Sequence, residues 1–108
     1  MYRIEKEDGA VTVYAEGRID TNGAPAFAAA MEEALKDATE LIIDCSGLEY
    51  ISSSGLRVIM LAVKTMNRQG KMKIIHVSEP VYEIMETTGF TGICDITMGG
   101  TGRENEPG

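Results

Sequence analysis

The chain has 108 residues, the usual size of a single domain. Seventeen acidic residues against ten Lys plus Arg give a formal net charge of −7, which argues against capture of nucleic acid or an anionic membrane surface. No apolar run approaches the roughly 20 residues of a membrane span, and the N-terminal residues lack the apolar stretch of a signal peptide. We therefore expect a cytoplasmic protein with no membrane or nucleic-acid partner. Nothing in the sequence demands more than a monomer.

The cysteines and the histidine indicate neither a disulfide framework nor a metal site. Cys45 and Cys94 each lie in a short apolar stretch, as small buried thiols do. His76 ends an apolar segment and is the single histidine of the chain, so we expect it to be structural. Without a second histidine or a cysteine cluster we expect no metal and no cofactor.

The N-terminal third predicts a hairpin followed by a helix. Apolar residues alternate over 2–6 and 11–15 on either side of Asp8-Gly9, a pattern typical of a β-hairpin. Gly17 to Asp20 leads to Thr21 or Asn22 as the expected helix cap, with Pro25 in the first turn. Apolar residues then recur at helical spacing as far as Ala38.

The remaining chain alternates between predicted strands and helices. An apolar run over 41–45, broken only by Asp44, predicts a strand covered on both faces, and 46–51 is expected to be a loop. A helix is expected over 56–68, ended by Gly70 in the left-handed conformation, and a strand over 71–77. Ser78 should cap a third helix that ends near Gly89, and 93–97 is a last strand candidate.

This order predicts an α/β fold with right-handed crossovers. It is a mixed sheet of four to five strands with helices packed on it, in the order β-β-α-β-α-β-α-β. The composition changes from Gly99 onward to Gly, Thr, Arg, Glu, Asn and Pro. We expect one folded domain over 1–98 and a disordered tail over 99–108.

Three consecutive serines, Ser52 to Ser54, stand just before the second helix. One possibility is that they only cap the helix, because Ser is a favoured N-cap. Another is that one of them accepts a phosphoryl group, which the backbone N–H groups and dipole of a helix N-terminus stabilise by about 0.3–1 kcal/mol. A catalytic serine is the third possibility, but the Gly-x-Ser-x-Gly frame is absent and His76 is the sole imidazole, so we expect no enzyme.

The helix after the serines has two different faces. One carries apolar residues from Leu56 to Met66 and is expected to face the core. The other carries Arg57, Leu61, Lys64 and Arg68, and residues 53–73 hold five basic side chains and no acid. Favourable charge near the helix C-terminus accounts for Lys64 and Arg68, but not for a cation in the first turn. We interpret Arg57, Val58 and Leu61 either as a docking edge or as simple solvated surface.

These residues resemble a known family, the STAS domain proteins that act as bacterial anti-sigma factor antagonists. The resemblance covers about residues 1–98 and rests in part on Gly17-Arg18-Ile19-Asp20 before the first helix. Its most specific part is the sequence LIIDCSGLEYISSSGLR over 41–57, and Pro80 with Gly89-Phe90 is similar to the third helix of the family and its exit.

The resemblance implies a phosphorylation switch. In such proteins the unmodified form binds an anti-sigma factor serine kinase and frees the sigma factor, and a metal-dependent serine phosphatase removes the phosphate. The phosphorylated position corresponds to Ser53. Many members carry Asp at the position of Ser52, so Ser52 is a second candidate acceptor. The residues expected to bind partners are Asp20, Thr21, Ser52, Ser54, Gly55, Leu56, Arg57, Val58 and Leu61.

Two other function classes stay open at this point. A constitutive STAS interaction module, such as a stressosome-like scaffold or the soluble partner of a lipid transporter, would keep the hydroxyls only as a cap. A small serine hydrolase is disfavoured by the missing base. Members of the family often end with a fourth helix, which the Gly-rich C-terminal segment here does not supply.

Overall fold

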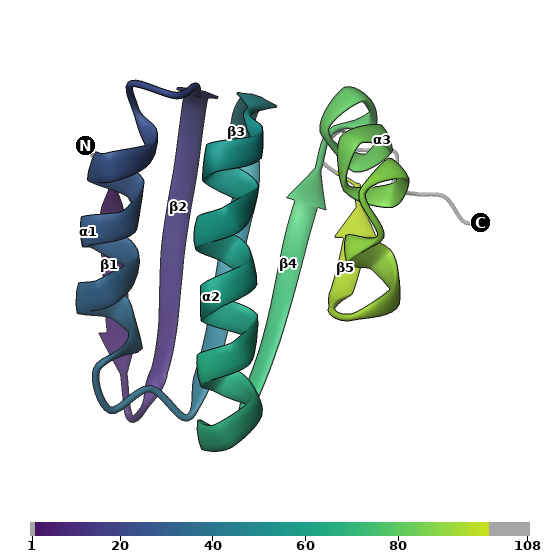
Figure 1. Cartoon of the computed structure of the whole chain (residues 1–108). Coiled ribbons are helices and arrows are strands. Elements are labelled where there is room, and N and C mark those ends of the chain that lie inside the picture. The colour runs from purple at the N-terminus through teal and green to yellow at the C-terminus, as the bar shows by residue number, and fades with distance from the viewer. Residues whose placement is uncertain (1, 100–108) are drawn as a thin grey trace.

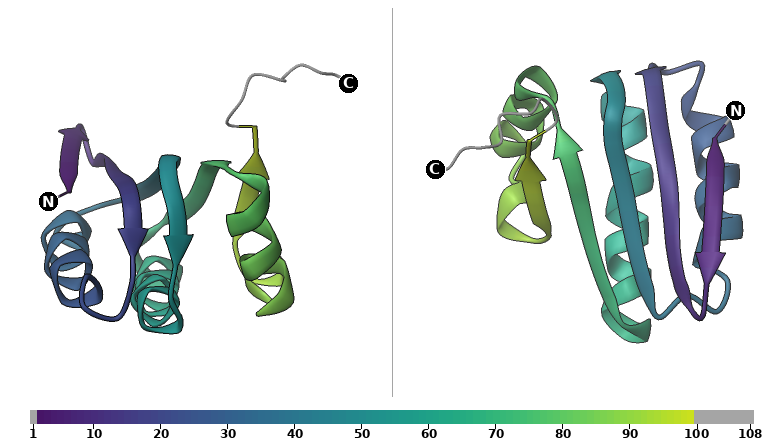
Figure 2. Two further views of the ribbon diagram at one scale, coloured as in Figure 1. Left: turned by 90° about the horizontal axis from the view of Figure 1, so that it is seen from above. Right: turned by 180° about the vertical axis from the view of Figure 1, so that it is seen from behind.

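The computed structural model describes residues 2–99 and contains one five-stranded sheet in the order β1-β2-β3-β4-β5. β1 is antiparallel to β2, and all other neighbours are parallel. Three helices cover one face of this sheet and leave the other face open (Figures 1 and 2). This arrangement confirms the predicted α/β fold and element order. The elements are β1 (Arg3–Glu7), β2 (Ala10–Ile19), α1 (Ala24–Leu35), β3 (Glu40–Ile51), α2 (Ser53–Gln69), β4 (Lys71–Val77), α3 (Glu79–Thr87), the 3-10 turn η1 (Phe90–Gly92) and β5 (Asp95–Met98).

The core lies between the helices and the covered face of the sheet. Ile19, Leu48 and Ile51 are buried there, and over 11–15 of β2 and 41–45 of β3 alternate residues are buried. The residues between them, such as Ile42, are only half-buried. The prediction that the strand over 41–45 is covered on both faces is therefore wrong. Its apolar run is continuous over 41–43 because Ile42 lies among other strand side chains on the open face.

The hairpin prediction is confirmed. Asp8 and Gly9 connect β1 to β2 with φ values of 53° and 87°. Two consecutive positive φ values are what a two-residue hairpin turn with the strand twist needs, and Asp-Gly adopts them readily. β1 is shifted by one residue from its predicted range, and β2 is longer than predicted because it continues through Gly17 to Ile19.

β3 is longer than predicted, because residues 46–51 are strand and not loop. The pairing with β2 shifts between Tyr14 and Glu16 and again between Gly17 and Arg18. At each shift β3 contains one more residue than β2, which is the geometry of a β-bulge. The bulges replace the period of two by buried residues at 45, 48 and 51, and so hide the strand from an alternation test.

The ends of the first two helices differ from the predictions. Neither Thr21 nor Asn22 caps α1, whose N-cap is Gly23. α2 starts at Ser53, three residues before the predicted start. It ends at Gly70 with φ 166°, which is extended and not left-handed. Gly70 is required for a different reason, because a Cβ there would lie 1.9 Å from the backbone oxygen of Thr39.

The C-terminal elements follow the predicted order. β4 has the predicted range, and Ser78 is the N-cap of α3, although its hydroxyl makes no capping hydrogen bond. β5 begins two residues later than expected, because η1 and a turn occupy 90–94. The expected disordered tail lies, from residue 100 onward, outside the described residues. Within residues 2–99, the helices are too short or too polar to cross a membrane.

Candidate functional site

The serine cluster stands where two parallel strands end side by side. Ile19 of β2 pairs with Ile51 of β3, and the next backbone N–H, that of Ser52, donates a hydrogen bond to the Ile19 oxygen at 2.8 Å. α2 begins immediately after this contact. The start of α2 is thus fixed to the carboxyl end of the sheet, where loops of α/β folds commonly bind ligands and partners.

The three hydroxyls have different surroundings. Ser52 is 8% exposed, and its Oγ accepts a hydrogen bond from the backbone N–H of Gly55 at 3.2 Å, so it is the N-cap of α2. Ser53, the first residue of the helix, is exposed, and Ser54 is half-buried. A hydroxyl that must reach another protein needs exposure, and Ser53 has the most of the three.

Gly55 holds the first turn of α2 close to the sheet. A Cβ at this position would lie 2.7 Å from Cγ1 of Ile51 and 2.9 Å from Cγ2 of Ile19. Only glycine allows the helix to approach both strand ends this closely. Leu56 is 6% exposed and belongs to the core. Among the predicted partner-binding residues, Gly55 and Leu56 therefore position the site and offer little surface of their own.

Asp20 and Thr21 follow β2 at the same end of the sheet and are both exposed. The Oδ1 atom of Asp20 accepts a hydrogen bond from the backbone N–H of Gly23 at 2.8 Å, and its main-chain oxygen accepts from Ala24 at 3.0 Å. Asp20 therefore closes the turn into α1, the role expected of Thr21 or Asn22. An Asp shortly before a helix is itself a signal for such a turn.

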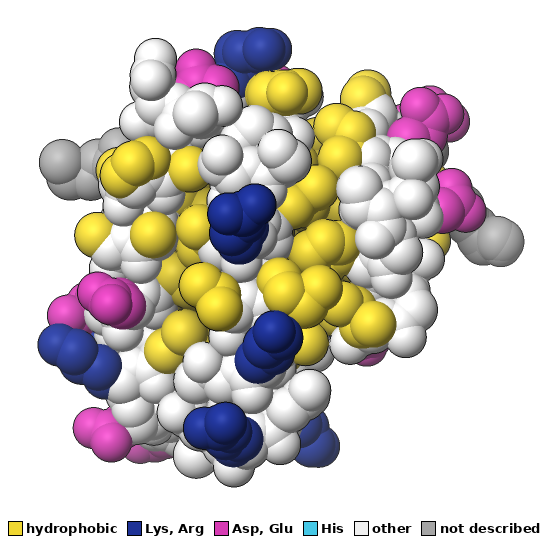
Figure 3. Space-filling view, in the orientation of Figure 1, with side chains coloured by type: hydrophobic (Ala, Val, Ile, Leu, Met, Phe, Trp, Pro, Cys, Tyr) yellow, Lys and Arg dark blue, Asp and Glu magenta, His cyan; other side chains and the backbone are white. Residues whose placement is uncertain are grey.

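The outer face of α2 continues from the serine cluster. Arg57 is exposed and Val58 half-buried, and Leu61 keeps 58% of its surface exposed. Lys64 and Arg68 are also exposed, while Ile59, Val63 and Met66 are buried as predicted. In Figure 3, Lys and Arg side chains form a row along α2 with hydrophobic surface on both sides. This face, which the sequence suggested either as a docking edge or as solvated surface, is therefore accessible.

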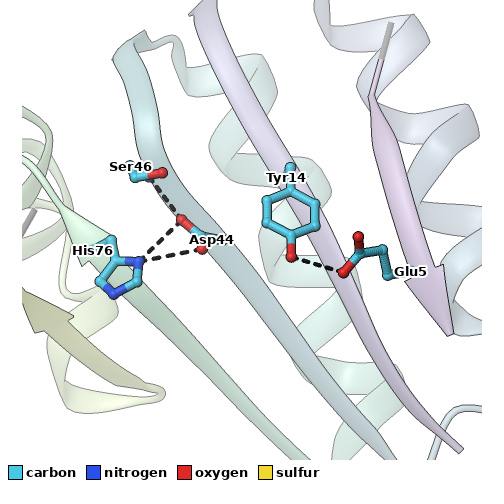
Figure 4. Close-up of polar contacts among 5 residues, drawn as sticks. All are labelled: Glu5, Tyr14, Asp44, Ser46 and His76. Atoms are coloured by element: carbon cyan, nitrogen blue, oxygen red, sulfur yellow. Dashed lines mark hydrogen bonds and ion pairs between the residues drawn. The ribbon is translucent and has the colours of Figure 1, made fainter. Parts of the chain in front are cut away.

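A second polar cluster lies on the open face of the sheet, joining β3 to β4 (Figure 4). Nδ1 of His76 lies 3.2 Å from both carboxylate oxygens of Asp44, and Oδ1 of Asp44 also accepts from the backbone N–H of Ser46 at 2.9 Å. Partial burial opposes ionisation of Asp44, but the Ser46 hydrogen bond and the His76 imidazole outweigh it and lower the pKa of this carboxyl.

This cluster separates the histidine of the chain from the serines. Ser52 directly follows β3 and stands eight residues after Asp44, a span of roughly 25 Å at the usual strand rise. The imidazole beside Asp44 is therefore out of reach of the hydroxyls at the start of α2. Sequence reasoning missed the His76–Asp44 pair; an Asp in an otherwise apolar strand was the available signal.

Both cysteines are free thiols. Cys45 is 1% exposed, and burial together with the charge of Asp44 raises its pKa to about 12. Cys94 is half-buried, and burial, with Asp95 nearby, raises its pKa as well. A thiol whose pKa is raised is a poor nucleophile at neutral pH. Within residues 2–99, no group of three or more His, Cys, Asp and Glu is arranged to hold a metal ion.

Comparison with known proteins decides the family. The profile of the family described as STAS domain matches residues 1–99. The chain belongs to the STAS domain family. An anti-sigma-B factor antagonist of Listeria monocytogenes is 29% identical over 94 residues, which are 85% of this chain and 82% of that protein.

Solved structures of anti-sigma factor antagonists share the fold. An anti-sigma factor antagonist from Mycobacterium paratuberculosis superimposes with a TM-score of 0.82 at 23% identity, covering 90% of this chain and 84% of the other. The Bacillus cell fate determinant SpoIIAA in its phosphorylated form gives 0.70 at 15% identity, covering 89% and 90%. At these identities the likeness establishes the architecture alone, which agrees with the family assignment.

Proposed function

We propose that this STAS protein is an anti-sigma factor antagonist controlled by phosphorylation of Ser53. The unmodified protein binds an anti-sigma factor serine kinase, and the sigma factor is released. Phosphorylation of Ser53 by that kinase ends the complex, and a metal-dependent serine phosphatase restores it. The names of the curated relatives support the function class. The observation that carries the site is the contrast between exposed Ser53 and capping, buried Ser52.

The surroundings of Ser53 suit a phosphate. A phosphoryl group adds about −1.5 to −2 charges at neutral pH. At the first helical position it lies next to backbone N–H groups without intrahelical partners and at the positive end of the helix dipole. Because Ser53 is exposed, the group needs no rearrangement of the core. The phosphorylated protein therefore keeps its fold and changes its surface.

Ser52 is the weaker candidate for phosphorylation. Its Oγ accepts the Gly55 hydrogen bond from inside the helix start, where 8% of the residue is exposed. A kinase would have to remove this cap before it could transfer phosphate to Ser52. Ser53 requires no such opening, which favours it on physical grounds alone.

The switch acts through charge and bulk at one contact. A kinase that transfers phosphate to Ser53 must bring its nucleotide phosphates to this helix start. A second anionic group fixed there would repel them and occupy the contact. A loss of about 3 kcal/mol in binding free energy would weaken the complex more than a hundredfold. The partner-binding surface then consists of Asp20, Thr21, Ser52, Ser54, Gly55, Leu56, Arg57, Val58 and Leu61, with the exposed members making the contacts.

The test is phosphorylation by a candidate anti-sigma factor kinase taken from the same genome. The protein is incubated with kinase and ATP, and intact mass and fragment spectra give the number and position of phosphates. We expect one phosphate on Ser53, none in Ser53→Ala, and unchanged incorporation in Thr88→Ala. Calorimetry with kinase and ADP should show that Ser53→Ala still binds and that phosphorylated protein does not.

Two results would contradict the proposal. Incorporation of one phosphate into Ser53→Ala would move the site to Ser52 or Ser54. Tight binding that phosphorylated protein retains would indicate a constitutive interaction module, such as a scaffold subunit or the partner of a lipid transporter.

A further inference from the structure

An apolar groove runs between α1 and α2 on the helix-covered side of the molecule. It has a volume of about 410 Å³ and is lined mainly by small and aliphatic side chains of the two helices, which lie side by side (Figure 1). Leu61, at 58% exposure, is the most exposed of the large hydrophobic residues described. The residues that matter here are Pro25, Ala28 and Leu35 from α1 and Val58, Leu61 and Ala62 from α2.

The two rims of the groove carry opposite charge. Glu32 lines it on the α1 side. On the α2 side Arg57, Lys64 and Arg68 occupy positions that share one stripe with Leu61, at spacings of four, three and four residues. Within residues 2–99 these three cations form no ion pair, whereas Lys6 and Lys36 on the α1 side both pair with Glu33. A protein with net charge −7 thus keeps an uncompensated basic row beside its most exposed leucine.

We propose that this groove is the docking site for an acidic amphipathic helix of a partner protein. Two helices side by side form a channel that a third helix fills with residues at i, i+3, i+4 and i+7. The apolar stripe of that helix would cover Leu61 and Val58, and its acidic flank would face Arg57, Lys64 and Arg68. The flank toward Glu32 would be neutral or basic. The charges therefore also specify the orientation of the bound helix about its own axis.

This inference deepens the proposed function, on which it rests for the identity of the partner. Arg57 and Val58 lie within two turns of Ser53, so a protein bound at the helix start could extend along the groove. The groove would then supply affinity that does not depend on the Ser53 hydroxyl. The test of the groove proposal uses neither kinase nor phosphate, so this proposal and the proposed function can fail separately.

The probe is a stapled 16-residue peptide with a leucine stripe and glutamate on one flank, titrated into ¹⁵N-labelled full-length protein. We expect amide shift changes confined to α1 and α2. A second peptide, with lysine in place of glutamate, should bind at least about tenfold more weakly. The net negative charge of the protein by itself favours the lysine peptide. Tighter binding of the glutamate peptide would therefore come from the local basic row. Shifts elsewhere, equal binding of both peptides or no binding at all would overturn the proposal.

Matched variants locate the binding. Leu61→Ser should weaken binding of the acidic peptide about tenfold or more. Ile93→Ser, which alters another exposed aliphatic residue outside the groove, should weaken it less than about twofold. The double variant Lys64→Gln with Arg68→Gln should weaken binding of the acidic peptide about fivefold. The control double variant Arg3→Gln with Lys73→Gln removes the same charge elsewhere and should have little effect. Equal losses in a variant and its control would overturn the proposal.

Two further measurements exclude other occupants. Vesicles of phosphatidylcholine and phosphatidylglycerol should not co-sediment with the protein; sedimentation that depends on Leu61 would assign the surface to a membrane and overturn the proposal. Light scattering at high concentration should give a monomer. A dimer that Leu61→Ser dissociates would show that a second copy of the chain fills the groove.

Discussion

The side-chain oxygen of Ser52 accepts a hydrogen bond from the backbone N–H of Gly55 at 3.2 Å, across the first turn of α2. The same two residues meet the end of β2, because the Ser52 N–H donates to Ile19 and Gly55 leaves no room for a side chain against Ile19. The start of α2 and the carboxyl end of β2 are thus joined by two independent contacts. Ser53, between them in sequence, is left exposed to solvent.

Removal of the cap should lower stability, whereas removal of the neighbouring hydroxyl should not. Ser52→Ala leaves the Gly55 N–H without its partner in a buried place, and we expect the free energy of unfolding to fall by about 1 kcal/mol. Ser53→Ala should change it by less than about 0.5 kcal/mol, because the residue is exposed. Urea unfolding of both variants measures the difference. A larger loss in Ser53→Ala would contradict the assignment of the cap.

Gly55→Ala should destabilise the protein although alanine favours helices. The new Cβ would meet Ile51 and Ile19 at less than 3 Å, and overpacking of this kind costs about 1–3 kcal/mol. The higher helix propensity of alanine returns up to about 1 kcal/mol. We expect a net loss of about 1 kcal/mol in urea unfolding. Gly92→Ala, where a Cβ has open space, is the control, and an equal loss there would refute this explanation.

Asp44 should make stability depend on pH in the acid range. The pKa of Asp44 is lowered in the folded protein, so its contribution is present above the unfolded value of about 3.9 and is lost as pH falls through the folded value. Asp44→Asn should therefore lose less stability than wild type between pH 5 and the acid limit of folding.

A second carboxylate variant serves as the control for the pH dependence expected of Asp44. Glu49→Gln removes an exposed carboxylate of the same strand and should leave the acid dependence close to that of wild type. Thermal unfolding at several pH values gives the comparison. Parallel pH profiles for Asp44→Asn and wild type would show that the Asp44 contacts with Ser46 and His76 contribute nothing.

The two thiols should react at different rates. Cys45 has a pKa of about 12 and is 1% exposed, so it should be alkylated only when the protein unfolds. Cys94 is half-buried with a raised pKa, and should react in the native state, more slowly than a free cysteine. Intact mass during incubation with iodoacetamide at pH 8 should show one adduct well before the second. Simultaneous double modification would contradict the burial of Cys45.

The sequence predicted elements best where periodicity and turn residues agreed. β4 over 71–77 and the Asp8-Gly9 hairpin needed only local information, since alternation and turn chemistry act over a few residues. Alternation predicts β3 only as far as Cys45, because its two bulges exist only in relation to β2. A pattern set by a neighbouring strand cannot be found in a single segment.

The sequence predicts that a polar helix start forms the site, but not the role of each hydroxyl in it. The serines Ser52 to Ser54 predict a helix start. Which of their hydroxyls caps the helix depends on how the helix packs against Ile19 and Ile51. The fit of α2 against α1, which forms the groove, also depends on tertiary packing. Gly70 illustrates the same limit. A glycine here predicts the end of α2, but this position requires glycine because of Thr39, 31 positions earlier in the chain.

The one-sided coverage of the sheet has a practical consequence. The helix start and the groove lie on the side that carries α1, α2 and α3 (Figure 2). Thr12 lies between buried Val11 and Val13 in β2, so strand alternation directs its side chain to the opposite side. A dye or surface tether attached through a cysteine introduced at Thr12 would leave both binding regions unobstructed. The open face of the sheet is therefore a suitable attachment surface for sensors that follow partner exchange in real time.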